Sequence, residues 1–262
     1  MFQFLSWAVD YLAPLFLIAS PITSYADQIV SIHRSKSSEG FSLDIPLIML
    51  VASILKVFYW FGAYYDKMLL AQSSLMVAVQ LALLKVSLDH KAPALVQHEP
   101  FADASIQHGL HALLQGKRPY NFWRWNSSKP YFRFLAYFTA GLLVIHLLLP
   151  FISGSPYYIA FLGYFGLAIE AILPVPQIYK NHIARSCKGF RLSVIINWLA
   201  GDTMKMSYFF LSSEYIPWPF RLCAIFQTGC DIYLGVQFYM YRNLPSSTKE
   251  IQMHSLGNSA LG

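Results

Sequence analysis

Residues 170–192 read E-A-I-L-P-V-P-Q-I-Y-K-N-H-I-A-R-S-C-K-G-F-R-L, and residues 193–210 continue S-V-I-I-N-W-L-A-G-D-T-M-K-M-S-Y-F-F. An apolar segment carries Glu170 and then two prolines. A short basic loop follows, and a second apolar segment carries Asp202 and Lys205. Because charges and prolines are costly inside membrane helices, this stretch predicts a polar feature within the bilayer.

The same pattern occurs a second time, earlier in the chain. A shift of 149 residues aligns positions 28–59 with 177–208 without a gap and gives 10 identities in 32 positions. Gln28 aligns with Gln177, Lys56 with Lys205, and the Gly-Phe pair at 40–41 with the pair at 189–190. An internal repeat in a membrane protein indicates a transporter-like architecture with its site between the two halves.

The composition is that of an integral membrane protein. Of the 262 residues, 56% are hydrophobic and 12% are charged, whereas soluble domains carry about 25% charged residues. The net charge of +6 does not indicate a nucleic-acid partner, because the basic residues sit in loops between apolar spans. Three cysteines predict no disulfide framework. The apolar N-terminus lacks a basic leader and is interpreted as the first span.

Seven segments have the length of about 20 apolar residues that a transmembrane helix needs. They cover residues 6–32, 42–63, 67–88, 130–151, 156–180, 191–211 and 217–241. The expected fold is therefore an all-α integral membrane protein, in which two parallel three-helix bundles are joined by a linker helix (3+1+3). The expected domains are the first bundle, 1–88; a cytosolic loop with an amphipathic helix, 89–128; the linker helix, 129–152; the second bundle, 153–241; and a tail, 242–262.

The lysines and arginines predict the orientation. Fifteen of the 19 lie in the loops 33–41 and 180–191, the segment 85–133 and the tail. Because positively charged loops stay in the cytosol, the N-terminus is expected in the lumen and the C-terminus in the cytosol. In the segment 89–128, Phe122, Trp123 and Trp125 stand among basic residues. This segment either lies in the membrane interface or packs on the cytosolic end of the bundle.

Ionisable and polar groups inside the spans are the candidate site, because such groups are usually functional. Asp202 and Lys205 are three residues apart on one helix, which predicts a local ion pair. No metal-ligand set, no nucleophile with a base and no nucleotide-binding loop accompanies them, so we expect no cofactor and a transporter rather than an enzyme. The candidate polar path consists of Glu170, Asp202, Lys205 and Asp231, with Lys56 and Gln80 from the first half. The alternative is a polar network that only ties the helices together.

The prolines form a second candidate feature. Pro174 and Pro176 remove backbone donors within a span and bend it, either as a hinge for alternating access or as a static kink. In the first repeat, Asp27 and Gln28 stand where the second has Pro176 and Gln177, and Pro21 lies upstream. The candidate hinge set is therefore Pro174, Pro176, Gln177, Asp27, Gln28 and Pro21.

These motifs resemble the PQ-loop family, which includes the SWEET sugar transporters, cystinosin and the KDEL receptor. The strings Glu170-Ala171, Val175-Pro176-Gln177, Tyr179-Lys180-Asn181-His182 and Gly201-Asp202 are most similar to the PQ-loop repeat-containing protein 1 group, also called solute carrier family 66 member 2, and its fungal flippase-antagonist relatives. The resemblance covers roughly residues 15 to 242. Asp27 departs from the usual proline, which puts a hinge in the first repeat in doubt.

The resemblance implies a multi-pass protein of Golgi and endosomal membranes. It would scramble aminophospholipids between leaflets and so oppose the asymmetry that P4-type flippases build, with membrane phospholipids as its partners. Two alternatives stay open, because one fold hosts all three functions. One is a proton-coupled small-solute exporter of the cystinosin type, with Asp202 or Asp231 as proton carrier. The other is a cargo receptor like the KDEL receptor. The oligomeric state is left open.

Overall fold

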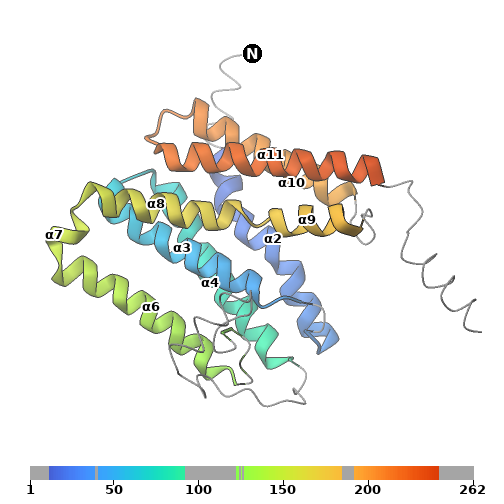
Figure 1. The fold of residues 1–262 in the computed structure, drawn as a ribbon, viewed down its shortest axis with the longest axis horizontal. Helices are drawn as coiled ribbons and strands as arrows, with labels where there is room; N and C mark the ends of the chain where they lie inside the picture. Colours follow the sequence, from blue (N-terminus) through green and yellow to red (C-terminus); the bar gives the residue numbers. More distant parts are fainter. Residues whose placement is uncertain are drawn as a thin grey trace, which may run out of the picture. The chain divides into compact units, whose positions relative to one another are not determined.

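A computed structural model describes residues 12–38, 41–91, 122–123, 125, 127–184 and 192–241. Its regular elements are helices: α2 (Ala13–Ser35), α3 (Asp44–Ala63), α4 (Lys67–Asp89), α6 (Lys129–Leu148), α7 (Pro150–Ser153), α8 (Pro156–Ala171), α9 (Val175–Ala184), α10 (Leu192–Leu211) and α11 (Trp218–Tyr241) (Figure 1). Gly40, Gly189, the predicted amphipathic helix and the tail lie outside the described residues.

The predicted all-α membrane fold is confirmed. Helices α2, α3, α4 and α6, and the segment Pro156–Ile183, are long and apolar enough to cross a membrane. Helices α10 and α11, with 20 and 24 residues, are also long enough. Their polar and ionisable residues, among them Asp202, Lys205 and Asp231, interrupt otherwise apolar sequences. The arrangement as two three-helix bundles with a linker remains a prediction.

The repeat is visible in the helices but differs at the prolines. Shifted by 149 residues, α3 corresponds to α10 and α4 to α11, while the single helix α2 corresponds to α8 and α9 together. Residues 172–174 form a turn between α8 and α9, in which Leu173 N–H donates to the Glu170 carbonyl at 3.2 Å and Val175 N–H to the Ile172 carbonyl at 2.9 Å. These shorter-range bonds use the two carbonyls that Pro174 and Pro176 leave without their usual helical donors. Helix α2 continues unbroken past Pro21.

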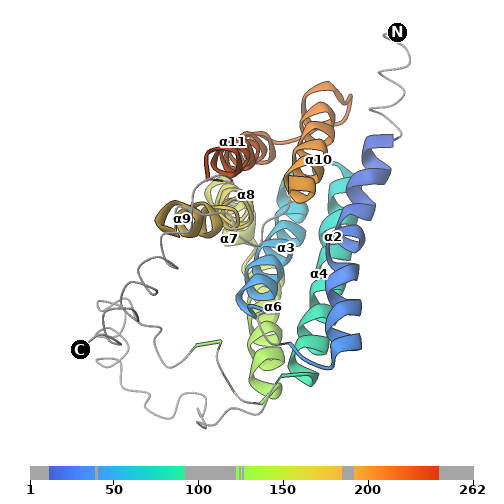
Figure 2. The same ribbon diagram turned by 90° about the vertical axis from the view of Figure 1, so that its right-hand side faces the viewer.

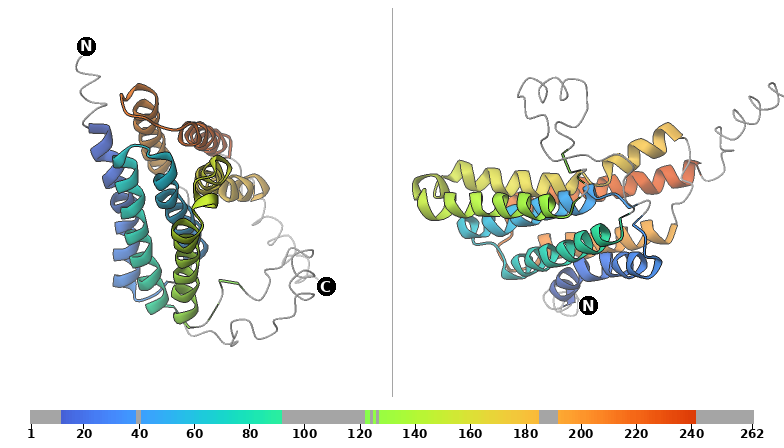
Figure 3. Two further views of the ribbon diagram at one scale, coloured as in Figure 1. Left: turned by 90° about the vertical axis from the view of Figure 1, so that its left-hand side faces the viewer. Right: turned by 90° about the horizontal axis from the view of Figure 1, so that it is seen from below.

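The chain divides into two compact units, which are described separately. In the unit Ile18–Gly166, α3 and α4 form a helical hairpin. Tyr64, in the left-handed conformation, ends α3, and the Asp66 carboxylate begins α4 by accepting a bond from Met68 N–H at 3.2 Å. The Tyr65 hydroxyl donates to the Lys56 carbonyl at 2.8 Å and so holds the turn against α3. Helix α4 also lies beside α2 (Figures 2 and 3), and Gln72 donates to the Ser20 hydroxyl at 3.3 Å.

Within the same unit, glycines let α3 and α8 approach closely. A methyl group added at Gly163 would lie 2.7 Å from the Tyr59 ring, and one at Gly62 would lie 2.5 Å from Ile159. Small residues at helix contacts are typical of membrane proteins, where close van der Waals packing takes the place of the hydrophobic effect.

Two tryptophans tie the end of the loop 89–128 to this unit. The Trp123 indole N–H donates to the Leu43 carbonyl at 2.6 Å, and the Tyr131 hydroxyl donates to the carbonyls of Trp123 and Trp125 at 3.2 and 3.0 Å. Both tryptophans are 1% exposed, so their side chains pack against the helix ends. We call Trp123, Trp125 and Tyr131 the aromatic clamp. Lys91, whose pKa is lowered by burial, donates to the Trp125 carbonyl at 3.0 Å.

The other unit consists of Leu167–Gly262 together with the residues up to Leu17. Helices α10 and α11 lie side by side as an antiparallel pair, and α9 packs against α11 (Figures 1 and 2). Gln237 on α11 donates to the Ile178 carbonyl on α9 at 3.0 Å. This unit therefore holds the Pro-Gln segment against the last helix.

Candidate functional site

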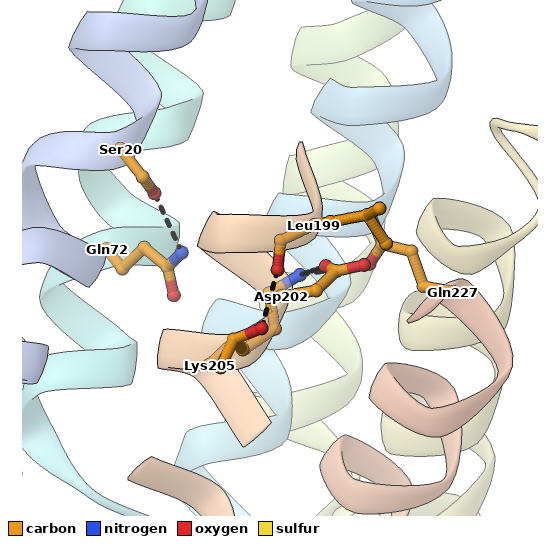
Figure 4. Close-up of polar contacts among 7 residues, drawn as sticks. Ser20, Gln72, Leu199, Asp202, Lys205 and Gln227 are labelled. Carbon is orange, nitrogen blue, oxygen red and sulfur yellow. Dashed lines mark hydrogen bonds and ion pairs between the residues drawn. The ribbon is translucent and has the colours of Figure 1, made fainter. Parts of the chain in front are cut away.

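A group of polar side chains lies between α10 and α11. Lys205 Nζ is 3.6 Å from Asp202 Oδ1, one turn away on α10, and donates to Gln227 Oε1 on α11 at 3.0 Å (Figure 4). The ion pair predicted from the i, i+3 spacing is therefore confirmed. Gln227, which was not among the candidate residues, turns this local pair into a bridge between two helices.

Asp231 completes the group. It lies one turn after Gln227 on α11, and its carboxylate is close enough to that of Asp202 for the two negative charges to repel one another. We call Asp202, Lys205, Gln227 and Asp231 the polar cluster. Within the cluster, the Lys205 ammonium contacts Asp202 Oδ1 and Gln227 Oε1. Asp202 Oδ2 and Asp231 Oδ1 are buried, and neither accepts a hydrogen bond from the described residues.

Burial divides the polar cluster into accessible and covered parts. The carboxylates of Asp202 and Asp231 are buried, with residue exposures of 4% and 3%, whereas 22% of the Lys205 side chain is exposed. The ammonium is therefore the group that an incoming anion meets first. Asp202 holds the lysine in place and neutralises it, because an isolated charge within a span would be costly.

The sequence carried a signal for Gln227. Glutamine is unusual in a lipid-facing helix, and residues 227 and 231 are four apart, so their side chains share one face of α11. This spacing could have placed Gln227 beside Asp231. It could not have shown that the partner is Lys205, because that contact depends on how α10 and α11 pack.

The Pro-Gln residues lie at the start of α9. Pro174 is buried in the turn, Pro176 is exposed, and half-buried Gln177 donates to Asn181 Oδ1 at 2.8 Å. Glu170 lies half-buried near the end of α8, just before the break. Gln177 therefore acts within its own helix, by fixing the buried Asn181 amide one turn later.

At the aligned positions, the first repeat keeps only the lysine of the polar cluster, since Lys56 aligns with Lys205. Ser53, Ala78 and Ala82 stand where the second repeat has Asp202, Gln227 and Asp231. Lys56, on α3, is 4% exposed, and Gln80, on α4, is fully buried and donates to the Met76 sulfur at 3.6 Å. Of the first-repeat hinge residues, Pro21 is buried within α2, Gln28 is half-buried and Asp27 is exposed.

These features define a helical membrane protein with a duplicated unit and an asymmetric polar cluster. Residues 18–69 and 158–218 both match the PQ loop repeat. The chain thus carries two PQ-loop repeats, as its motifs predicted, and the matched ranges contain the corresponding helices α3 and α10. Proteins with this repeat are membrane proteins of the transport type.

Among characterised proteins, the chain is similar to Scramblase ANY1 of Saccharomyces cerevisiae (strain ATCC 204508 / S288c). The two are 29% identical over 289 aligned positions, which cover 89% of this chain and 71% of the yeast protein. The similarity thus extends over both repeats and the segment between them.

Proposed function

We propose that this protein is a phospholipid scramblase. It would move aminophospholipids between the leaflets of Golgi and endosomal membranes, and so oppose the asymmetry built by P4-type flippases. The observation that carries the proposal is the polar cluster, in which a partly exposed cation stands beside two buried acids inside helices of membrane-spanning length. The similarity to a yeast scramblase over 89% of the chain supports it.

The charges of the polar cluster suit a phospholipid headgroup. A translocating headgroup brings a phosphate and, in serine and ethanolamine lipids, an amine through the apolar core. Lys205 would bind the phosphate as a compact cation. Because Asp202 and Asp231 are covered, they would meet the amine only after α10 and α11 separate. Glu170, Lys56 and Gln80 would supply further polar groups along the path.

Passive exchange of this kind needs no energy source. Both leaflets offer the same headgroup chemistry, so a path that lowers the barrier in one direction lowers it equally in the other. The break between α8 and α9 would allow the Pro-Gln segment to move without breaking further helical bonds, since its carbonyls already have partners within the turn. We infer that Pro174 and Pro176 provide the hinge.

The test is lipid translocation in liposomes with the purified protein. Fluorescent serine and choline phospholipids are placed in both leaflets, and an impermeant quencher destroys the outer pool. We expect fast loss of the inner pool without ATP or a pH gradient. An inner pool as stable as in protein-free liposomes would contradict the proposal.

A double variant and a control variant test whether the headgroup path runs through the polar cluster. Asp202→Asn combined with Lys205→Met removes both charges of the ion pair and keeps the side-chain sizes similar. Thr203→Val is the matched control, because Thr203 is exposed on the same helix and its hydroxyl only bonds to the Leu199 carbonyl at 2.8 Å. The path lies elsewhere if the double variant scrambles as fast as this control.

The neighbouring acids favour proton-coupled export as a second candidate function. Two adjoining carboxyl groups can share one proton, and both Asp202 and Asp231 are buried in the polar cluster. Uptake of a water-soluble amine or zwitterion that follows an imposed pH gradient, without lipid exchange, would support this function and exclude scrambling.

The proposed location has its own test. We propose residence in Golgi and endosomal membranes, with the N-terminus in the lumen and the C-terminus in the cytosol. Tags at the two ends can be stained after permeabilising only the plasma membrane. The C-terminal tag should stain and coincide with Golgi or endosomal markers, whereas the N-terminal tag should stain only after full permeabilisation.

A further inference from the structure

An apolar groove runs between α6 and the hairpin of α3 and α4. Its volume is about 680 Å³, within the range of roughly 300–1,000 Å³ typical of small-ligand sites. The groove is lined by Leu50, Ile54, Val57, Phe58, Ser74, Val77, Leu81, Phe132, Leu135, Ala136, Thr139, Ala140 and Leu143. All of them belong to one compact unit.

The groove is distinct in chemistry from the polar cluster. No ionisable side chain lines it, and of its two hydroxyls that of Ser74 is already bonded to the Leu70 carbonyl at 2.9 Å. It offers no charge with which to guide a headgroup across a bilayer. Because all three helices are of membrane-spanning length and apolarity, the groove opens at the depth where acyl chains surround the protein.

Cationic side chains continue two of the groove-lining helix faces at one end. Lys85 follows Leu81 by four residues on α4, and Lys129 precedes Phe132 by three on α6, so each lies one turn beyond the groove. Both lysines are exposed. Arg133 and Asp89 are the other charged residues within a turn of these lysines, and Asp44 begins α3 at the same end, so the charges of these five residues sum to one positive.

The geometry points to a resident anionic phospholipid of the cytosolic leaflet, with an acyl chain in the groove and its phosphate between Lys85 and Lys129. Both ends of such a ligand meet a complementary surface: an apolar wall at acyl-chain depth, and cations where the headgroup begins. This site goes beyond the proposed scrambling path, which runs through other residues. Its cytosolic assignment rests on the orientation predicted from the basic loops.

The test uses a phospholipid that carries a photoreactive diazirine in its acyl chain, reconstituted with the full-length protein. After illumination, mass spectrometry maps the labelled residues. We expect the labels to concentrate on groove residues such as Val77, Thr139 and Leu143, and serine or phosphatidic acid probes to label more than choline probes. Labels spread evenly over the lipid-facing helices would overturn the proposal, and this map needs no variant.

Two substitutions on α6 test whether the lipid binds in the groove itself. Ala140→Phe fills the groove and should lower labelling about tenfold, because overpacking is costly. Gly141→Phe adds the same ring one residue away, where an added Cβ meets nothing within 4 Å, and should leave labelling unchanged. The groove site is wrong if Ala140→Phe and Gly141→Phe label equally.

A double lysine variant and a control variant test the headgroup end of the site. Lys85→Gln with Lys129→Gln should reduce labelling by the anionic probe about threefold, as expected for exposed charge contacts, and should leave choline labelling unchanged. Lys67→Gln, at the opposite end of α4, is the control. Labelling does not require translocation, so a protein that fails to scramble can still label in the groove, and one that scrambles can lack the labels.

Discussion

Gln237 on the last helix donates a hydrogen bond of 3.0 Å to the Ile178 carbonyl, directly after the Pro-Gln pair. Gln237 is 1% exposed, so the bond lies in a dry environment where a missing partner is costly. It links the segment that defines the repeat to a helix almost 60 residues later in the chain. Any motion of α9 about the break at 172–174 must therefore stretch this bond or carry α11 along.

We predict that Gln237→Ala destabilises the second half of the chain. The variant loses one buried hydrogen bond and leaves a small cavity, a cost of about 2 kcal/mol. Thermal unfolding of the purified protein in detergent measures the change. Val236→Ala is the control, because its side chain is 46% exposed and should have little effect. Equal midpoints for the two variants would show that the bond does not hold α9.

The ion pair between Asp202 and Lys205 should show strong coupling. Asp202→Asn leaves the lysine with less compensation, and Lys205→Met leaves a buried carboxylate alone. Each single change should cost about 1–3 kcal/mol, and the double variant less than the sum, because it leaves no uncompensated charge.

A double-mutant cycle on the unfolding midpoint measures this coupling. Gln227→Leu extends the cycle to α11, since Gln227 accepts a bond from the same ammonium at 3.0 Å. Additive effects of Asp202→Asn and Lys205→Met would mean that the 3.6 Å contact contributes no energy.

The same glycine-to-alanine substitution should affect stability differently at two positions. Gly163→Ala places a Cβ 2.7 Å from the Tyr59 ring, which overpacks the contact of α3 with α8 and should cost about 1–3 kcal/mol. Gly141→Ala meets nothing within 4 Å and should be neutral or stabilising by about 0.5–1 kcal/mol, because alanine favours the helix. The unfolding midpoint of Gly163→Ala should therefore lie below that of Gly141→Ala; a Gly163→Ala protein as stable as Gly141→Ala would refute the close contact.

The aromatic clamp should depend on one hydroxyl. Tyr131→Phe removes the donor to the carbonyls of Trp123 and Trp125 and keeps the ring, so the expected cost is about 1 kcal/mol. Limited proteolysis of the loop before Trp123 should accelerate. Tyr137→Phe serves as control because Tyr137 is 70% exposed, and identical cleavage rates in the two variants would count against the clamp.

The helices and their repetition could be predicted from the sequence alone. Spans are long apolar runs and repeats are aligned letters, so both are local properties that need no knowledge of packing. The predicted spans 42–63 and 67–88 match α3 and α4 within two residues. The pairing of Asp202 with Lys205 followed for the same reason, because helical geometry alone brings i and i+3 side chains together.

Which distant residues meet could not be predicted, because these contacts depend on how the helices pack. Lys205 bonds to Gln227 and Gln237 to Ile178 because α11 packs against α10 and α9, and no local pattern encodes that register. The burial of Trp123 and Trp125 was equally undecided, since an aromatic beside cations suits both a membrane interface and a protein interior. The apolar groove is a further case. A space between helices arises from how three of them diverge, so the sequence of one helix cannot predict it.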